Sequence, residues 1–149
     1  MQQLTPLIFP KADLLLTKKK EVLYVNCLVR KKTVVLSPEE WVRQHVLHFL
    51  VNFKDYPLSR LSVEKSINYN GLTKRWDIVA YDADFKPKLL VECKQTEVNI
   101  GLDTLVQAAS YQKIIQSEHI LLTNGKQVLH FAINKNNHYS SSIDTIAGY

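Results

Sequence analysis

The sequence lacks the residues that mark several classes of protein. Its 149 residues include only 2 Cys, 4 Gly and 5 Pro, with 46% hydrophobic and 22% charged residues. Two cysteines are too few for a disulfide framework or a four-ligand zinc site, so we expect both to be reduced. Collagen-like and disordered chains are excluded by the same counts. A chain of this length can bury a core of its own, and we expect a single domain over 1–149.

Long hydrophobic runs are also missing. The longest, such as 14–16 and 34–36, hold only a few residues, whereas a helix that crosses a bilayer needs about 20. Residues 1–10 carry neither the basic region nor the apolar region of a secretory signal. We therefore expect no membrane partner and a cytoplasmic location.

The sequence supports neither a phosphate-binding loop nor a serine nucleophile. The glycines are scattered rather than gathered in a phosphate-binding loop, and no serine is flanked by glycine as in a nucleophile elbow. His45 and His48 lie close together, but no third metal ligand follows at a matching spacing. We therefore interpret both as partly exposed helix residues.

Positive charge is in excess. Lys and Arg number 19 against 14 Asp and Glu, which gives a net charge of +5 and favours a polyanionic partner such as nucleic acid. Two basic runs, 18–20 and 30–32, are interpreted as solvated turns. Many basic proteins bind nothing acidic, so the net charge indicates nucleic-acid binding only together with a recognisable site.

The pattern divides the chain into three regions. Residues 1–36 form an N-terminal extension, with a β-hairpin predicted over 21–36. Residues 37–134 form the main fold. Residues 135–149 are a C-terminal tail, and the polar stretch 134–142 predicts that it frays.

The start of the main fold is typical of a helix N-terminus. Ser37 can cap the first turn, Pro38 suits the first helical position, and Glu40 completes a capping box. The helix should run to Phe53. Its predicted apolar stripe, at helical spacing, consists of Val42, Val46, Phe49, Leu50 and Phe53.

Strands and a second helix follow. The expected elements are strands over 61–69, 74–82 and 88–94, a helix over 102–116, and strands over 119–123 and 127–133. Asn70-Gly71 and Asn124-Gly125 are the turn signals between them. This order predicts an α/β fold with a mixed sheet.

The third of these strands carries Glu92 and Lys94, which share one face because strand side chains alternate. Asp77, in the preceding strand, is as far from the middle of the loop over 82–87 as Glu92 is. Antiparallel pairing through that loop therefore makes the two carboxylates neighbours, while Trp76 points to the other face.

Adjacent carboxylates repel each other, and a half-buried carboxylate is costly unless it is paired. A divalent cation would offset that repulsion, and Mg²⁺ needs only one or two carboxylates together with water and phosphate oxygens. Lys94 could orient the attacking water or stabilise the charge that builds on a phosphate. These are the parts of a metal-assisted phosphodiesterase. The alternative is an ordinary salt-bridge cluster of Asp77, Glu92 and Lys94 on a solvated face.

A second motif follows on the next predicted helix. Gln107 and Tyr111 are four residues apart and share one face. Together with Asp77 and the Glu-x-Lys run at 92–94, they resemble the PD-(D/E)XK nuclease superfamily, in which one branch carries Gln-x-x-x-Tyr. Trp76 stands where the name of the superfamily has Pro.

Residues 36–44 and 123–125 resemble, more narrowly, the N-terminal nuclease domain of type I restriction enzyme R subunits. The resemblance spans about 30–134. It implies a restriction-endonuclease-like three-layer core in the order αβββαβ. The chain carries no helicase motor, so we expect no ATP-driven translocation.

The resemblance also assigns roles to residues. Asp77, Glu92 and the backbone carbonyl of Cys93 would ligate Mg²⁺ or Mn²⁺. Lys94 would be the catalytic lysine, and Gln107 would position the site.

Five more residues are candidates. Glu40 matches an additional acidic ligand of many such nucleases, although the capping box explains it without a metal. Tyr111 would contact the nucleic-acid backbone or simply pack the helix on the sheet. Arg43, Lys74 and Arg75 are candidates to line a backbone-binding groove.

The leading hypothesis is thus a Mg²⁺-dependent endonuclease-like domain that hydrolyses DNA phosphodiester bonds. One alternative is a non-catalytic module that uses the same fold to bind nucleic acid or protein. Another is a subunit that cuts only within a larger restriction-type complex. Because duplex cutting needs two active sites or two visits, a homodimer is also expected.

Overall fold

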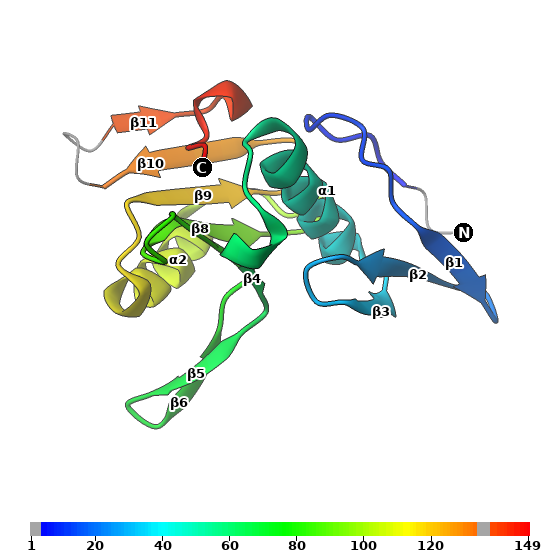
Figure 1. Cartoon of the computed structure of the whole chain (residues 1–149), viewed down its shortest axis with the longest axis horizontal. Helices are drawn as coiled ribbons and strands as arrows, with labels where there is room; N and C mark the ends of the chain where they lie inside the picture. The colour runs from blue at the N-terminus through cyan, green and yellow to red at the C-terminus, as the bar shows by residue number, and fades with distance from the viewer. Residues whose placement is uncertain (1–3, 134–137) are drawn as a thin grey trace.

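A mixed six-stranded sheet forms the centre of the computed structural model, which describes residues 4–133 and 138–149 (Figure 1). Its spatial order is β11-β10-β9-β8-β7-β4, and only β8 and β9 run parallel. The strands are β4 (Leu61–Val63), β7 (Ile78–Tyr81), β8 (Pro87–Cys93), β9 (His119–Thr123), β10 (Val128–Ala132) and β11 (His138–Ser140). The predicted mixed sheet is confirmed.

Two helices, α1 (Pro38–Phe53) and α2 (Leu102–Ile115), cover opposite faces of this sheet. Alternate strand residues divide between them, as the side-chain period of a strand requires. The α1 face buries Val42, Val46, Leu50, Ile78, Val91 and Cys93, and the α2 face buries Val79, Leu90, Ala108, Tyr111 and Leu122. The result is the predicted three-layer α/β fold with elements in the order αβββαβ.

The N-terminus of α1 is capped as predicted, but only half of the capping box forms. Ser37 Oγ accepts a hydrogen bond from the backbone N–H of Glu40 at 3.1 Å, and Pro38 occupies the first turn. The Glu40 carboxylate does not return to the cap, because it binds the guanidinium groups of Arg30 and Arg43 instead. Phe53, predicted in the apolar stripe, is 57% exposed, and His45, predicted to be partly exposed, is buried.

Two predicted strands are each broken in two. The segment 61–69 divides into β4 and β5 (Ser66–Tyr69), and the segment 74–82 contributes to β6 (Leu72–Arg75) and β7. Glu64 interrupts the first run with a left-handed backbone of φ +50°. β5 and β6 pair only with each other, as a hairpin that projects from the body (Figure 1).

Trp76 does not face as predicted. It packs with Val79, Leu90 and Tyr111 on the α2 face rather than beside Ile78 on the α1 face. Residue 76 lies outside β6 and β7, so strand alternation does not carry across it.

The N-terminal region is a three-stranded antiparallel sheet rather than a hairpin. It contains β1 (Leu16–Lys19), β2 (Val22–Cys27) and β3 (Lys32–Val35). The basic run 18–20 is partly in β1 rather than wholly in a turn. Arg30 is not solvated as predicted, because its side chain is only 10% exposed and its guanidinium pairs with Glu64 at 3.0 Å.

The C-terminal residues from 138 onward do not fray. β11 pairs with β10, and a short 3-10 turn, η2 (Ile143–Thr145), leads to Ile146, which is buried. The backbone N–H of Tyr149 donates to the carbonyl of Lys54 at 2.9 Å, which ties the end of the chain to α1. The first part of the predicted tail, 134–137, lies outside the described residues.

Across the described ranges, no helix is long and apolar enough to span a bilayer. Cys27 and Cys93 are both free and buried. A second 3-10 turn, η1 (Leu58–Arg60), joins α1 to β4.

Candidate active site

Asp77 and Glu92 face each other across neighbouring strands. β7 and β8 are antiparallel, with Ile78 opposite Val91 and Val79 opposite Leu90. The next step of this register sets Asp77 opposite Glu92. Both carboxyls are buried at the end of the sheet where β8 finishes. The predicted juxtaposition is present.

Asp77 is held from two directions. Its Oδ1 accepts from Arg43 of α1, at 2.5 Å from Nη2 and 3.2 Å from Nε. Its Oδ2 accepts from the backbone N–H of Cys93 at 2.7 Å. These three hydrogen bonds fix the carboxylate in one orientation and supply a cation beside it.

Glu92 is much less well satisfied. Its Oε1 lies 3.7 Å from Nζ of Lys94, while its buried Oε2 has no hydrogen-bond partner among the described residues. Burial and the neighbouring charge of Asp77 raise the pKa of Glu92 to about 9. Below that pH the carboxyl keeps its proton and is neutral, and a cation bound beside it would displace the proton and fill the open position on Oε2.

Lys94 is positioned by α2. Its Nζ donates to Oε1 of Gln107 at 2.8 Å, and Nε2 of Gln107 donates to the hydroxyl of Tyr111 at 3.3 Å. The backbone N–H of Lys94 donates to the carbonyl of Thr123 at 2.8 Å, so hydrogen bonding to β9 continues one residue beyond the end of β8. The predicted shared helix face is therefore a hydrogen-bonded chain that ends on the lysine.

These residues lie at a cleft made of two adjoining hollows of about 400 and 650 Å³. Glu39, Lys94 and Gln107 line both hollows. Asp77 and Glu92 line the smaller hollow, whereas the larger one opens toward the N-terminus of α2. The cleft gives the paired carboxylates and the lysine a common route to solvent.

The sequence pointed to Glu40 as the acid that α1 contributes to the site, but the neighbouring Glu39 is the one that lines the cleft. Glu40 is buried, pairs with Arg30 and Arg43, and accepts from Nε2 of Gln44 at 2.8 Å. Glu39 lines the cleft, and burial together with the charge of Asp77 raises its pKa. Its position one turn before Arg43 was the only sequence signal for it.

Arg43 is not part of a groove wall. It is buried, and it pairs with Glu39 at 2.9 Å, Glu64 at 3.3 Å and Asp77. Although burial lowers the pKa of a guanidinium, the charge of Asp77 raises that of Arg43 above its ordinary value. Its physical role is to neutralise a buried cluster of carboxylates.

The other candidates for nucleic-acid contact all line the smaller hollow but differ in exposure. Lys74 and Arg75 line the smaller hollow, and the Arg75 side chain is 63% exposed. Tyr111 also lines this hollow, although it is buried and packs in one cluster with Trp76. Glu64, which the sequence did not single out, lines the same hollow.

No group of three or more His, Cys, Asp or Glu side chains within 4–133 and 138–149 is arranged to hold a metal ion by itself. The carboxylate donors that line the smaller hollow are Asp77 and Glu92, which face each other, together with Glu39 and Glu64. Two carboxylates suit Mg²⁺, which keeps several waters, better than a cation that demands a complete protein cage.

The sequence matches one family model over residues 38–147, described as type I restriction enzyme R protein N terminus (HSDR_N). The chain belongs to this family. The match runs from the first turn of α1 past η2, so it includes every residue of the cleft named above. The fold is consistent with the nuclease superfamily that the motifs resemble. No curated protein matches the chain.

Proposed function

We propose that this R-protein N-terminal domain is a Mg²⁺-dependent endonuclease that hydrolyses DNA phosphodiester bonds at the cleft. The observation that carries the proposal is the Glu92 carboxyl, which is buried opposite Asp77 and has one oxygen without a partner among the described residues. A structural salt-bridge cluster would instead pair that oxygen. A cation site explains why it is left open.

The residues fit a divalent metal. A carboxylate offers about four lone-pair positions, and Asp77 uses three of them for Arg43 and Cys93. One position on Asp77 and the open oxygen of Glu92 are left for the ion, and the carbonyl of Cys93 is the third proposed donor. Glu39 replaces Glu40 as the additional acid. Bound there, Mg²⁺ would polarise a phosphate oxygen and lower the pKa of a water.

The protein's own contribution is to place a positive charge. Lys94 is held by Gln107 at 2.8 Å, so its ammonium is fixed in the lining of the cleft. There it orients the attacking water and stabilises the charge that grows on the phosphate in the transition state. Lys74 and Arg75 at the rim would bind the phosphates on either side.

The test is incubation of plasmid DNA with Mg²⁺ or Mn²⁺, comparing the wild type with Asp77→Asn and Lys94→Ala. Each variant is expected to lose at least about 100-fold in rate, the size of a lost acid–base or electrostatic contribution. Lys126→Ala is the matched control, because this lysine is 45% exposed and its ion pair is with the exposed Glu97. Cutting that survives in both site variants would refute the assignment.

The second candidate is a DNA-binding domain that cuts only inside a larger complex, as family membership favours. The pairing of Asp77 with Arg43 supports it, because the acid is already neutralised by the protein. DNA binding without cutting by the isolated chain, and cutting once partner subunits are added, would select this candidate.

Size-exclusion chromatography tests the expected homodimer. The free, buried cysteines fit a reducing, cytoplasmic compartment.

A further inference from the structure

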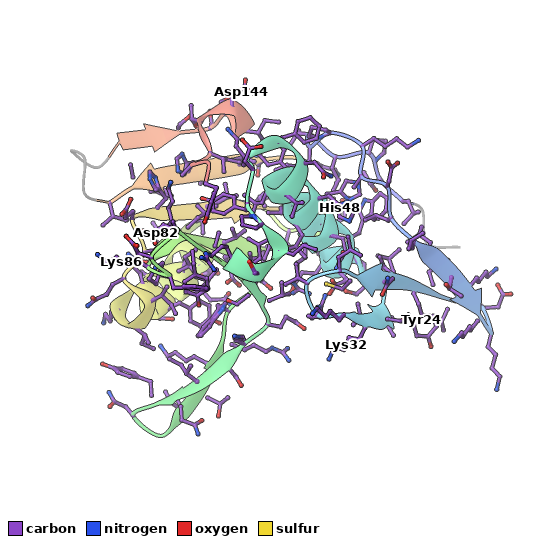
Figure 2. All side chains as sticks on the ribbon, in the orientation of Figure 1. Tyr24, Lys32, His48, Asp82, Lys86 and Asp144 are labelled. Atoms are coloured by element: carbon purple, nitrogen blue, oxygen red, sulfur yellow. The ribbon has the colours of Figure 1, made fainter. Side chains whose placement is uncertain are left out.

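The β5–β6 hairpin stands apart from the rest of the protein. Its two strands pair only with each other, and it projects away from the main sheet (Figure 1). Every residue over 65–75 is exposed except Ile67 and Lys74, which are partly buried. Its side chains point outward on both sides of the ribbon (Figure 2). Ile67 packs against the core cluster that contains Trp76 and Tyr111, whereas the exposed remainder of the hairpin does little for the core, so its shape needs another explanation.

The hairpin is regular and narrow. Asn70 and Gly71 form its tight turn with φ +50° and +77°, the positive pair that a two-residue hairpin turn requires. Ser66 pairs with Arg75 at one end, and Tyr69 pairs with Leu72 at the other. Four residues per strand give a length of about 13 Å. A two-stranded ribbon of this kind fits the major groove of B-form DNA, which is about 12 Å wide.

The charge of the hairpin suits a polyanion. The segment 65–75 contains Lys65, Lys74 and Arg75 and no acidic residue. The nearest carboxylate is Glu64, 3.7 Å from Arg75. Most of the remaining side chains are Ser, Asn, Thr and Tyr, which can donate and accept hydrogen bonds at phosphates and base edges.

The base of the hairpin is part of the cleft. Thr73, Lys74 and Arg75 line the smaller hollow together with Asp77. Asp77 follows Arg75 by two residues. A duplex that lies along the hairpin therefore has one of its backbones beside the paired carboxylates.

We infer that the β5–β6 hairpin is an arm that enters the major groove of a DNA duplex, with Lys74 and Arg75 on phosphates at its base. The inference rests on the proposed function, because it names the duplex as the substrate and supplies the contact that orients it. The major groove of A-form RNA is too narrow for such a ribbon, and a single strand has no groove.

A shortened hairpin tests the arm directly. Deletion of residues 68, 69, 72 and 73 brings the Asn70-Gly71 turn onto the Ile67–Lys74 pair and keeps the strand register. Binding is measured by fluorescence anisotropy in EDTA, with a labelled duplex longer than one helical turn and with its single strand. We expect the duplex affinity to fall at least about tenfold and the single-strand affinity to change much less.

A charge variant covers the case in which the deletion disturbs folding. Lys74→Gln with Arg75→Gln should lower the salt slope of duplex binding by about 0.9 for each lost phosphate contact. The matched control is Lys19→Gln with Lys32→Gln, two exposed lysines of the N-terminal sheet (Figure 2 labels Lys32). This control should leave the slope unchanged.

The outcomes separate the two proposals. Four results would each overturn the arm. Two concern the hairpin variants: unchanged duplex binding in both, or equal losses of affinity for duplex and single strand. The other two are an equal change of salt slope in the control pair and no duplex binding by the wild type. If the wild type fails to cut DNA with Mg²⁺ or Mn²⁺ but the hairpin variants lose duplex binding in EDTA, the nuclease proposal fails and the arm stands. If the wild type cuts DNA but the hairpin variants bind the duplex as the wild type does, the arm fails and the nuclease proposal stands.

Discussion

The guanidinium of Arg43 lies 2.5 Å from Oδ1 of Asp77, although the two residues are 34 positions apart in the chain. This contact joins α1 to the end of strands β7 and β8, where the candidate site lies. Arg43 also pairs with Glu39 and Glu40, so one buried cation neutralises acids from two layers of the fold. Removal of Arg43 would leave Asp77 buried with no cation paired to it and with only the backbone N–H of Cys93 as a partner in the described part of the chain.

We therefore expect Arg43→Met to lower the free energy of unfolding by about 3–5 kcal/mol, the usual result of breaking a buried ion pair. Urea denaturation at pH 7 measures it. Arg75→Gln is the control, because Arg75 is 63% exposed and its change should stay within about 0.5 kcal/mol. Equal effects of the two substitutions would mean that the buried network does not stabilise the fold.

Glu92 should make stability depend on pH. Its pKa is about 9 in the folded protein against an ordinary value of 4.5, so the folded state keeps a proton that the unfolded state releases. Stability should therefore decline as the pH rises from about 4.5 to about 9. Glu92→Gln removes this titration, and in EDTA it should stabilise the protein at pH 8 by about 1–3 kcal/mol.

Thermal unfolding from pH 5 to pH 9 tests this expectation, and the gain from Glu92→Gln should shrink toward pH 5. Glu97→Gln serves as the control, since Glu97 is exposed. Added Mg²⁺ should raise the melting temperature of the wild type and not that of Glu92→Gln. Parallel pH profiles for wild type and Glu92→Gln would contradict the raised pKa.

His130 should make the stability of the fold depend on pH on the acidic side. Burial and the neighbouring His119 lower the pKa of His130 to about 4, from an ordinary value of 6.5. The folded state resists protonation, so stability should fall as the pH drops from about 6.5 to about 4, by up to about 3 kcal/mol. Replacing His130 with Gln should flatten this part of the profile. An unchanged acid limb in His130→Gln would show that other groups control it.

Gln107 should matter through Lys94. It accepts from Nζ of Lys94 at 2.8 Å, so Gln107→Ala frees the lysine from its position. If the domain is a nuclease, we expect kcat to fall about 10- to 100-fold with a smaller change in KM, as for a misplaced catalytic group. Val106→Ala, on an exposed position of the same helix, should have no such effect. A change in KM alone would assign Gln107 to substrate binding.

The residues of the cleft differ in how far the sequence foretold them. Strand alternation and the symmetry of the 82–87 loop predicted that Asp77 and Glu92 would be neighbours, and the ladder from β7 to β8 agrees. Helical spacing predicted the shared face of Gln107 and Tyr111. These are local geometric rules, which hold once an element and its turn are correct.

Other features depended on distant contacts. Glu39 and Glu40 are adjacent acids in one helical turn. Glu40 is buried against Arg30 and Arg43, whereas Glu39 lines the cleft. The break at Glu64, which makes β5–β6 a separate hairpin, lies in a run with continuous strand character.

The amino-acid sequence by itself determined the α/β alternation, the cap at Ser37 and the pairing of the two carboxylates, because periodicity and turn chemistry act over a few neighbouring residues. Only the tertiary structure decided which charges are buried, that Arg43 holds Asp77, and that the residues from 138 onward join the sheet and α1. The reason is physical: burial of a charge and the pairing of an edge strand are set by partners that lie far away along the chain.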